Sequence, residues 1–242
     1  MNLNKSNRMC SICARGGSKG LKNKNLMTID GNTLIEISIQ HALQSNLFDT
    51  VSVSSDSDEI LKQAELSGAK NLIMRPSNLA SDKAAKIPAI RHCIRETQKI
   101  TGKDYDTFVD LDATSPLRTI KDISDCIKLV EENYAENSFS VSPSHRSPYF
   151  NMVEETDSGY VKLCKKLDST IVRRQDAPTC YDMNASIYVW SRSSIFDGED
   201  ILFKKRTKHH IMPLERSWDI DSSIDAEIVE FLYLRNKKRN HG

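Results

Sequence analysis

Short runs of apolar residues alternate along the chain with longer stretches in which apolar positions recur every three or four residues. The short runs predict β-strands, and the recurring positions predict amphipathic helices. The predicted strands cover residues 9–13, 50–54, 71–74, 107–111, 139–142, 186–190 and 209–212. The predicted helices begin near residues 34, 56, 88, 120 and 224. This alternation favours a doubly wound α/β sheet, mostly parallel, with ligands at the carboxyl ends of its strands.

Two of the predicted helices begin at residues that can cap them. Asp56 stands three residues before Glu59, which is the spacing of a capping box. Thr119 precedes the helix at residue 120, and Pro116 restricts the backbone before it. We expect Asp56 and Thr119 to be N-caps.

Residues 145–182 do not follow this pattern. They contain short alternating pieces at 151–154 and 160–167 among polar turns, without a long periodic helix. Because 242 residues suit one α/β domain, we interpret this region as a hairpin insertion within a single domain, residues 1–242. An isolated hairpin is only marginally stable in water, so the insertion needs a surface to pack on.

The composition indicates a globular protein without a strong overall charge. Hydrophobic residues make up 38% and charged residues 28%, and the formal net charge is +1, so no global field attracts nucleic acid. No apolar run approaches the roughly 20 residues of a membrane span. Residues 1–8 also lack the apolar core of a signal peptide. We therefore expect a cytoplasmic protein that binds neither nucleic acid nor a membrane.

We do not expect the cysteines or the histidine pair to bind a metal. Cys10 and Cys13 have the spacing of a metal or redox pair, but no second Cys/His pair lies at ligand spacing. Residues three apart on a strand also point to opposite faces, as do the neighbours His209 and His210. We expect reduced cysteines that serve in packing.

The turn after the first predicted strand combines glycines with positive charge. Gly16, Gly17 and Gly20 let the backbone approach a polyanion closely. The cations of this turn are Arg15, Lys19, Lys22 and Lys24. The spacing matches neither GxxxxGK[ST] nor GxGxxG. A loop of this kind before a helix is suited to bind nucleotide phosphate, although an ordinary solvated turn has the same composition.

Asp219 and Asp221 are candidate ligands for a divalent cation. Residues two apart on an extended chain share a face, and paired carboxylates suit a hard cation such as Mg²⁺. The alternative is that both aspartates cap the helix that follows. The phosphate-type loop elsewhere in the chain favours the metal site.

Four stretches in this order resemble the acylneuraminate (CMP-sialic acid) cytidylyltransferases. They are residues 14–20 with 22–26, residues 75–76 with 79–82, residues 114–118, and residues 219–221. The resemblance extends from about residue 9 to residue 232. It implies a Rossmann-like nucleotidyltransferase fold with a mixed sheet. The implied reaction is the transfer of CMP from CTP to a nine-carbon 2-keto sugar acid, with release of pyrophosphate, for cell-surface glycans.

The resemblance also assigns roles to residues. The implied nucleotide-binding residues are Ala14, Arg15, Gly16, Gly17, Ser18, Lys19, Lys24, Asn25, Arg75 and Ala84. The implied sugar-binding residues are Asp112, Ser115, Arg174, Gln175 and Asn184. Arg15, Lys24 and Asp221 are the implied catalytic residues, and Asp219 with Asp221 holds Mg²⁺. The general base stays open between a carboxylate and a metal-activated hydroxyl.

In the family, the insertion packs against a second subunit and completes its sugar site. We therefore expect a homodimer in which Arg174, or its neighbour Arg173, contacts the sugar carboxylate, because a planar guanidinium binds a carboxylate in two places. The chain has Asp112 where relatives specific for N-acetylneuraminate mostly have Gln. It also has Asp182-Met183-Asn184-Ala185 where they often have Arg-Pro-Asn-Gly. At both positions the chain looks more like the bacterial enzymes that activate legionaminic acid.

Three alternatives are weaker. A cytidylyltransferase for the eight-carbon lipopolysaccharide acid is disfavoured, because its loop has Ser-Thr-Arg after Ala-Arg. A nicotinamide-dependent dehydrogenase is disfavoured because the chain lacks the GxGxxG motif. A non-catalytic nucleotide-binding module would not need Arg15, Lys24, Asp219 and Asp221 together.

Overall fold

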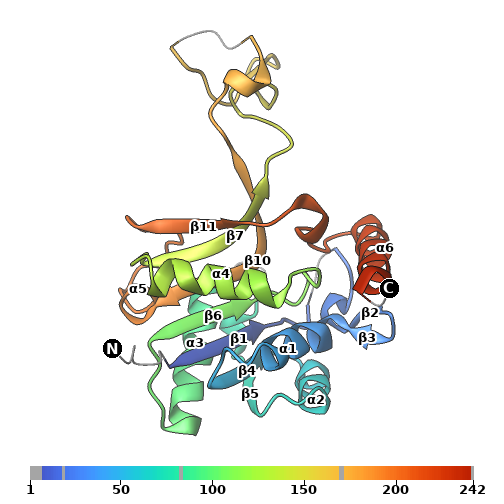
Figure 1. Ribbon diagram of the computed structural model, residues 1–242, viewed down its shortest axis with the longest axis vertical. Helices are drawn as coiled ribbons and strands as arrows, with labels where there is room; N and C mark the ends of the chain where they lie inside the picture. Colours follow the sequence, from blue (N-terminus) through green and yellow to red (C-terminus); the bar gives the residue numbers. More distant parts are fainter. Residues whose placement is uncertain (1–6, 18–19, 82–83, 169–171, 241–242) are drawn as a thin grey trace.

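The computed structural model describes residues 7–17, 20–81, 84–168 and 172–240. Within these residues a seven-stranded sheet has the order β11-β7-β10-β6-β1-β4-β5 (Figure 1). Its strands are β1 (Arg8–Cys13), β4 (Thr50–Ser55), β5 (Asn71–Met74), β6 (Thr107–Leu111), β7 (Asn137–Pro143), β10 (Tyr181–Ser191) and β11 (Thr207–Ile211). β10 runs antiparallel to its neighbours, and the other pairs are parallel. The predicted mixed, mostly parallel sheet is confirmed.

Helices cover both faces of this sheet. α1 (Leu34–Gln44), α2 (Asp58–Leu66) and α4 (Ile120–Glu131) pack on one apolar cluster, while α3 (Lys86–Thr101) and α5 (Arg192–Ile195) pack on another. Along β1, Cys10 belongs to the first cluster, and Met9 and Cys13 to the second. Successive strand side chains point to opposite faces, so the doubly wound arrangement and the separation of Cys10 from Cys13 are confirmed.

One of the two predicted N-caps is confirmed, and the other is wrong. Thr119 caps α4 in a reciprocal pair with Asp122, as predicted. The cap of α2 is Ser57, whose side chain accepts a hydrogen bond from the Ile60 N–H at 3.4 Å, so the prediction for Asp56 is wrong. The Asp56 carboxylate instead accepts a bond from the backbone of the glycine-rich loop. The competing partner lies far away in the sequence, which local spacing cannot reveal.

A third apolar cluster packs α6 (Ser223–Asn240) against the first turn of α1. It includes Leu34, Ile220 and Val229. The hairpin of β2 (Thr28–Ile29) and β3 (Asn32–Thr33) lies beside it (Figure 1). Because Ile220 is buried in this cluster, it fixes the segment that carries Asp219 and Asp221.

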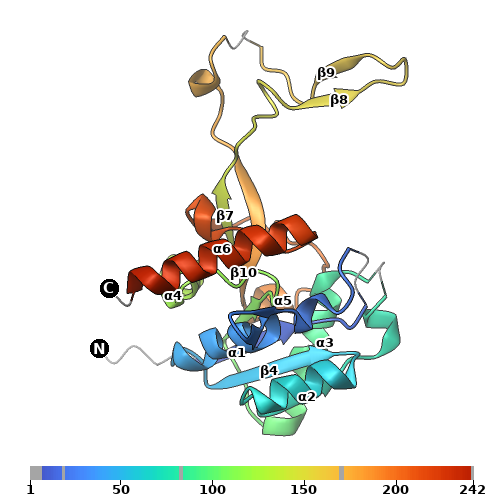
Figure 2. The same cartoon turned by 90° about the vertical axis from the view of Figure 1, so that its right-hand side faces the viewer.

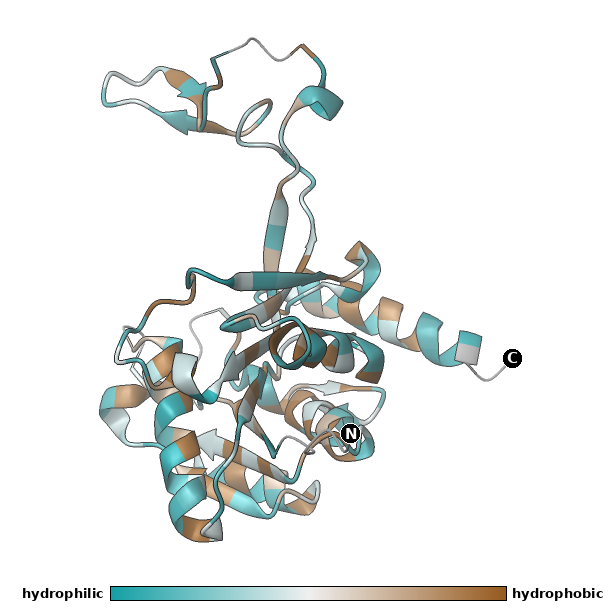
Figure 3. Ribbon diagram, turned by 60° about the vertical axis from the view of Figure 1, so that its left-hand side comes forward, coloured by the Kyte–Doolittle hydropathy of each residue, from teal (hydrophilic) through white to brown (hydrophobic). Residues whose placement is uncertain are grey.

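Residues 144–168 and 172–180 form an arm that projects from the sheet between β7 and β10 (Figure 2). The arm carries the hairpin of β8 (Val153–Glu155) and β9 (Val161–Leu163) and the short helix η3 (Arg174–Asp176). Most of its described residues are hydrophilic, and apolar residues are scattered among them (Figure 3). Tyr160, Val161 and Val172 are 76%, 68% and 79% exposed. The predicted hairpin insertion is therefore present, and it makes little contact with the sheet of its own chain.

Among the described residues, no helix is long and apolar enough to cross a bilayer.

Candidate active site

A cleft of about 320 Å³ lies at the carboxyl ends of β1, β5 and β6. Its walls come from the loop after β1, the short helix η1 (Lys24–Leu26), the residues between β5 and α3, and the segments that follow β6 and precede α6. It is lined by Cys13, Arg15, Lys24, Asn25, Arg75, Leu79, Ala80, Ser81, Ala84, Ala85, Lys86, Ala89, Asp112, Thr114 and Asp219. Seven residues predicted for nucleotide, sugar or metal thus meet in one place: Arg15, Lys24, Asn25, Arg75, Ala84, Asp112 and Asp219.

The glycine-rich loop is held by backbone and side-chain bonds to its neighbours. The Ala14 N–H donates to the Ser54 carbonyl at 3.0 Å, and the Asn25 amide donates to the Arg15 carbonyl at 2.9 Å. The Gly16 N–H donates to Asp56 Oδ1 at 2.8 Å. This amide, which the sequence assigned to phosphate, therefore has a protein acceptor here. Ser18 and Lys19 lie outside the described residues.

Two glycines of this loop are needed for close approach. A Cβ at Gly16 would lie 2.9 Å from Ser57 Cβ, next to the start of α2. A Cβ at Gly20 would lie 2.4 Å from the Asp221 carbonyl oxygen. Gly17 has open space around it. The loop is thus packed directly against the segment that carries the two candidate metal ligands.

Lys24 links the loop to that same segment electrostatically. Its Nζ lies 2.9 Å from Asp221 Oδ1, and the Asp221 side chain is 78% exposed. The alternative that Asp219 and Asp221 cap α6 is wrong, because Ser222 and Asp225 form the reciprocal cap.

Arg75 is a buried cation at the end of β5. Its Nε donates to Ser54 Oγ at 3.2 Å and its Nη2 to the Ser54 carbonyl at 2.7 Å. These bonds fix the guanidinium against β4 while it lines the cleft.

Asp112 is paired with a cation that the sequence analysis missed. Lys86 Nζ lies 2.8 Å from Asp112 Oδ2 and 3.3 Å from Asp110 Oδ2. Burial opposes the charge of Asp112, but Lys86 and Thr114 lower its pKa to about 2. In the sequence Lys86 lies at the end of a polar loop that also contains Lys83, and no local pattern distinguishes it.

Asp219 lies beside Asp112 at the same end of the cleft. The Thr114 hydroxyl contacts carboxylate oxygens of both aspartates, and Ser115 Oγ lies 3.3 Å from Asp219 Oδ1. Burial and the nearby Asp112 carboxylate raise the pKa of Asp219. Negative charge therefore accumulates at this end, as expected where a cation binds.

The remaining predicted sugar-binding residues beneath the cleft are deeply buried. Asn184 accepts from Ser140 Oγ at 2.6 Å and donates to Ser217 Oγ at 3.1 Å, and Ser115 is fully buried. Arg118 of the same motif is also buried, and its guanidinium holds the carbonyl oxygens of Ser186 and Asp112. In this conformation these side chains support the floor of the cleft, and their role as sugar contacts stays a prediction.

Arg174 and Gln175 lie on the arm and not in the cleft. They line a separate cavity of about 380 Å³ with Ser144 and Arg146. Arg174 Nη2 donates to the Ser144 carbonyl at 2.7 Å, while Arg173 pairs with Asp176. One chain alone does not bring Arg174 to the nucleotide-type cleft.

Comparison with known proteins shows relatives that match nearly the whole chain in sequence. A post-translational flagellin modification protein B of Campylobacter coli is 41% identical, over 93% of this chain and 94% of the relative. A CMP-N,N'-diacetyllegionaminic acid synthase of Campylobacter jejuni is 40% identical over the same shares. A pseudaminic acid cytidylyltransferase of Campylobacter jejuni is 32% identical, over 94% of this chain and 97% of the relative.

The fold also matches a solved structure. A CMP:2-keto-3-deoxy-manno-octonic acid synthetase complexed with CTP aligns with a TM-score of 0.69 at 15% identity, covering 96% of this chain and 100% of that one. At this identity the match concerns the fold, which is Rossmann-like. The family model described as Cytidylyltransferase matches residues 9–239. The chain therefore belongs to the cytidylyltransferase family, the CTP-using nucleotidyltransferases.

Proposed function

We propose that this protein is a CMP-nonulosonic acid synthetase, which transfers CMP from CTP to a nine-carbon 2-keto sugar acid. The observation that carries the proposal is the meeting of Arg15, Lys24, Arg75 and Asp219 in one cleft at the carboxyl ends of the strands. These residues come from three of the four motifs and from parts of the chain far apart in sequence. A relative of 40% identity carries the name of such a synthase.

The cations of the cleft suit a triphosphate. Arg15 and Lys24 lie on the loop and on η1, where they neutralise phosphate charge, while Arg75 and the backbone near Ala84 face the base. Catalysis of such a transfer consists mainly of positioning and charge stabilisation. The anomeric hydroxyl of the sugar acid gives its proton to the general base, and its oxygen bonds to the α-phosphorus. The bond from that phosphorus to the oxygen that bridges the α- and β-phosphates breaks, and pyrophosphate leaves.

The aspartates at the end of the cleft fit a Mg²⁺ ion. Asp219 and Asp221 flank the buried Ile220, and both lie close to Lys24. The described residues hold no cluster of three or more His, Cys, Asp or Glu ligands. Two carboxylates with water and substrate phosphates are a usual Mg²⁺ environment. Bound there, Mg²⁺ would supply charge stabilisation at the α-phosphate or the attacking hydroxyl.

We infer that the sugar acid is legionaminic acid in preference to N-acetylneuraminic acid. Asp112 at the rim of the cleft and Asp182 on β10 are the departures that support this choice. The relative named for N,N'-diacetyllegionaminic acid, at 40% identity, supports it as well.

A homodimer would complete the site. Arg174 lies on the arm, away from its own cleft, and the arm exposes Tyr160, Val161 and Val172. In a two-fold dimer each arm packs on the partner, which buries this apolar surface and carries Arg174 to the partner's sugar acid.

Pyrophosphate release with CTP and Mg²⁺ tests the function directly. We expect turnover with legionaminic acid, with kcat/KM about tenfold above that for N-acetylneuraminic or pseudaminic acid. Asp219→Asn and Asp221→Asn should each lower kcat by about 100-fold or more without unfolding the protein. No turnover with any sugar acid would refute the function. Near-full turnover in both variants would refute the metal site.

A further inference from the structure

Lys86 is the first residue of α3, and its ammonium group lies between two carboxylates at the end of β6. Its Nζ is 2.8 Å from Asp112 Oδ2 and 3.3 Å from Asp110 Oδ2. It also lies 4.4 Å from the centre of the Tyr188 ring. The ammonium group donates a hydrogen bond to Asp112, forms an ion pair with Asp110 and lies over the aromatic ring. Lys86 lines the cleft, but its charge is directed at protein groups.

Asp110 depends on this lysine. Its side chain is fully buried, and Oδ1 accepts a hydrogen bond from Ser11 Oγ at 2.7 Å. Oδ2 is buried without a hydrogen-bond partner among the described residues, and the Lys86 ammonium, at 3.3 Å, forms an ion pair with it. A buried carboxylate without a cation is strongly disfavoured, so the ion pair with Asp110 fixes the position of the Lys86 ammonium group.

Asp112 keeps accepting capacity toward the cleft. Its Oδ1 accepts from the Thr114 N–H at 3.3 Å and lies 3.0 Å from the Thr114 hydroxyl, while Oδ2 accepts from Lys86. A carboxylate has about four acceptor sites. The Asp112 side chain lines the cleft and is 24% exposed, so a further donor can reach the carboxylate from there. As long as Asp112 is ionised, it can only accept hydrogen bonds.

We propose that Lys86 is a positioning residue that holds Asp112 as a fixed, ionised acceptor for a hydroxyl or amide N–H of the sugar acid. The inference rests on the proposed function. The sugar acid is favoured over CTP as the donor, because the Thr114 hydroxyl joins Asp112 to Asp219, the carboxylate nearest the reacting phosphate in that function.

The charged and titratable groups around Asp112 explain why a cation is required. They are Lys86 from α3, Asp110 from β6, Arg118 at the Asp112 carbonyl, Tyr188 from β10 and Asp219. Arg118 and Lys86 are the cations, and Arg118 contacts the backbone and not the carboxylate. Without Lys86, Asp112 would face two other carboxylates, and its pKa would rise toward the range of an enzyme assay.

Four variants test this arrangement: Lys86→Met, Asp112→Asn, the double variant, and Lys99→Met as control. Lys99 lies on α3 far from the cleft and pairs with Glu96 at the surface. We expect Lys86→Met and Asp112→Asn each to raise KM for the sugar acid about tenfold, with less than about threefold change in KM for CTP. The double variant should be no worse than Asp112→Asn, because both act through the same carboxylate.

The pH profile separates positioning from a merely structural role. In the wild type Asp112 stays ionised throughout an assay between about pH 5 and 8, so kcat/KM for the sugar acid shows no ionisation of this group. In Lys86→Met, kcat/KM should fall as pH drops through the raised pKa of Asp112. A lower melting temperature without this new acid limb, or effects of the two single variants that add, would overturn the proposal. So would a larger rise in KM for CTP than for the sugar acid.

Two further measurements keep the test decisive. If Lys86→Met does not fold, Asp112→Asn is compared with the double variant instead. A tenfold difference between these two variants in KM for the sugar acid would overturn the proposal. Urea unfolding from about pH 3 to 8 needs no substrate. The stabilisation by ionised Asp112, present above about pH 4 and lost below it, should vanish in Lys86→Met even if the proposed function fails.

Discussion

Individual residues of the cleft are placed by close contacts that leave little room for change. Gly20 packs against the Asp221 carbonyl, and Lys24 pairs with the Asp221 carboxylate. The glycine-rich loop and the aspartate segment therefore form one unit, although about two hundred residues separate them in sequence. A glycine that the sequence assigns to phosphate approach also serves contact within the protein.

Gly20→Ala should impair catalysis through this contact. The added methyl group would lie 2.4 Å from the Asp221 oxygen, so the loop or the aspartate segment must shift. We expect kcat/KM for CTP to fall about 100-fold, as a shift of about 1 Å in a catalytic group can cause. Gly17→Ala adds the same group in open space and should cost much less. Equal kinetics of the two variants would contradict the role of the contact.

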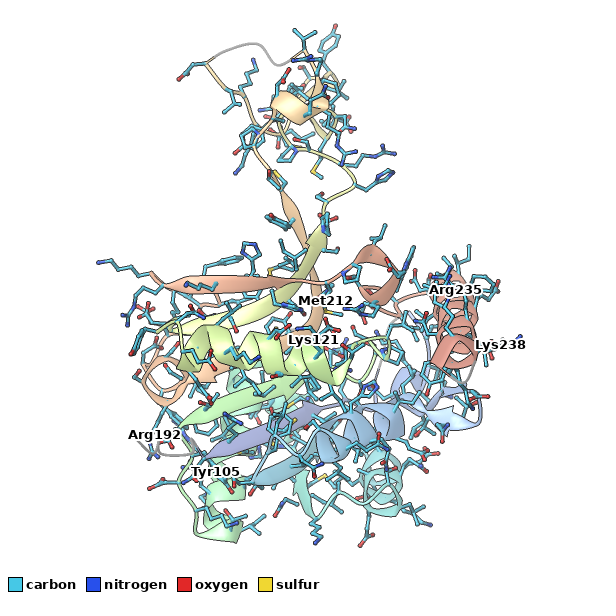
Figure 4. The ribbon with its side chains drawn as sticks, in the orientation of Figure 1. Tyr105, Lys121, Arg192, Met212, Arg235 and Lys238 are labelled. Carbon is cyan, nitrogen blue, oxygen red and sulfur yellow. The ribbon has the colours of Figure 1, made fainter. Side chains whose placement is uncertain are left out.

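At the scale of elements, Asp122 joins three parts of the protein at the base of the aspartate segment. It caps α4 with Thr119, and it accepts bonds from His210 on β11 at 3.0 Å and from Arg216 Nη2 at 2.8 Å. Arg216 ends the short helix η4 (Leu214–Arg216), three residues before Asp219. Figure 4 labels Met212, which lies where β11 leads into this segment. The same aspartate thus anchors the start of α4 and the approach to Asp219.

Asp122→Asn should reveal this anchor through the pH dependence of stability. Burial opposes the charge of Asp122, but bonds from His210, Arg216 and Thr119 hold its pKa well below its usual value near 4. A depressed pKa stabilises the folded protein above the unfolded-state pKa, and the effect disappears as pH falls. We expect the wild type to exceed the variant by about 2 kcal/mol in unfolding free energy at pH 7.

Urea unfolding at several pH values measures this difference. The advantage of the wild type should shrink from about pH 4 downward, as Asp122 takes up its proton in the unfolded chain first. A difference that stays constant down to about pH 2 would show that the carboxylate charge contributes nothing. Asp125→Asn on the same helix, whose partners are surface lysines, is the control.

At the scale of the whole molecule, the arm is the feature that has little of its own chain to pack against. It extends from β7 and β10 well beyond the sheet (Figures 1 and 2), and it carries exposed apolar residues together with Arg174. The cleft has cations for a triphosphate but no arginine from the arm. In the proposed homodimer, a second copy of the chain would supply this arginine.

We predict that the protein is a homodimer in solution and that Arg174→Ala raises KM for the sugar acid about tenfold, with KM for CTP nearly unchanged. Only the sugar carboxylate would lose its partner. Light scattering measures the mass, and steady-state kinetics the two KM values. Arg173→Ala is the comparison, because Arg173 pairs with Asp176 on the arm itself. A fully active monomer would refute the assembly, and an unchanged sugar KM in both variants would refute the carboxylate contact.

The sequence alone predicted the strands, the helices on both faces and the edge at which the cleft lies. Periodicity is a local property, and parallel strands bring their carboxyl ends to one edge. Arg15, Arg75 and Asp112 follow different strands, so their meeting could be anticipated before any contact was known. The inserted hairpin was likewise visible as a break in the pattern.

The tertiary structure decided which polar groups are free and which are already bonded. The Asp56 carboxylate accepts a hydrogen bond from the Gly16 N–H and does not cap α2. Lys86 lies between Asp110 and Asp112, and Asn184 is buried under the cleft. The tertiary structure also set the antiparallel direction of β10. Each of these depends on partners many residues away in the chain, and the spacing of residues along a sequence carries no information about which distant donor will reach a given acceptor.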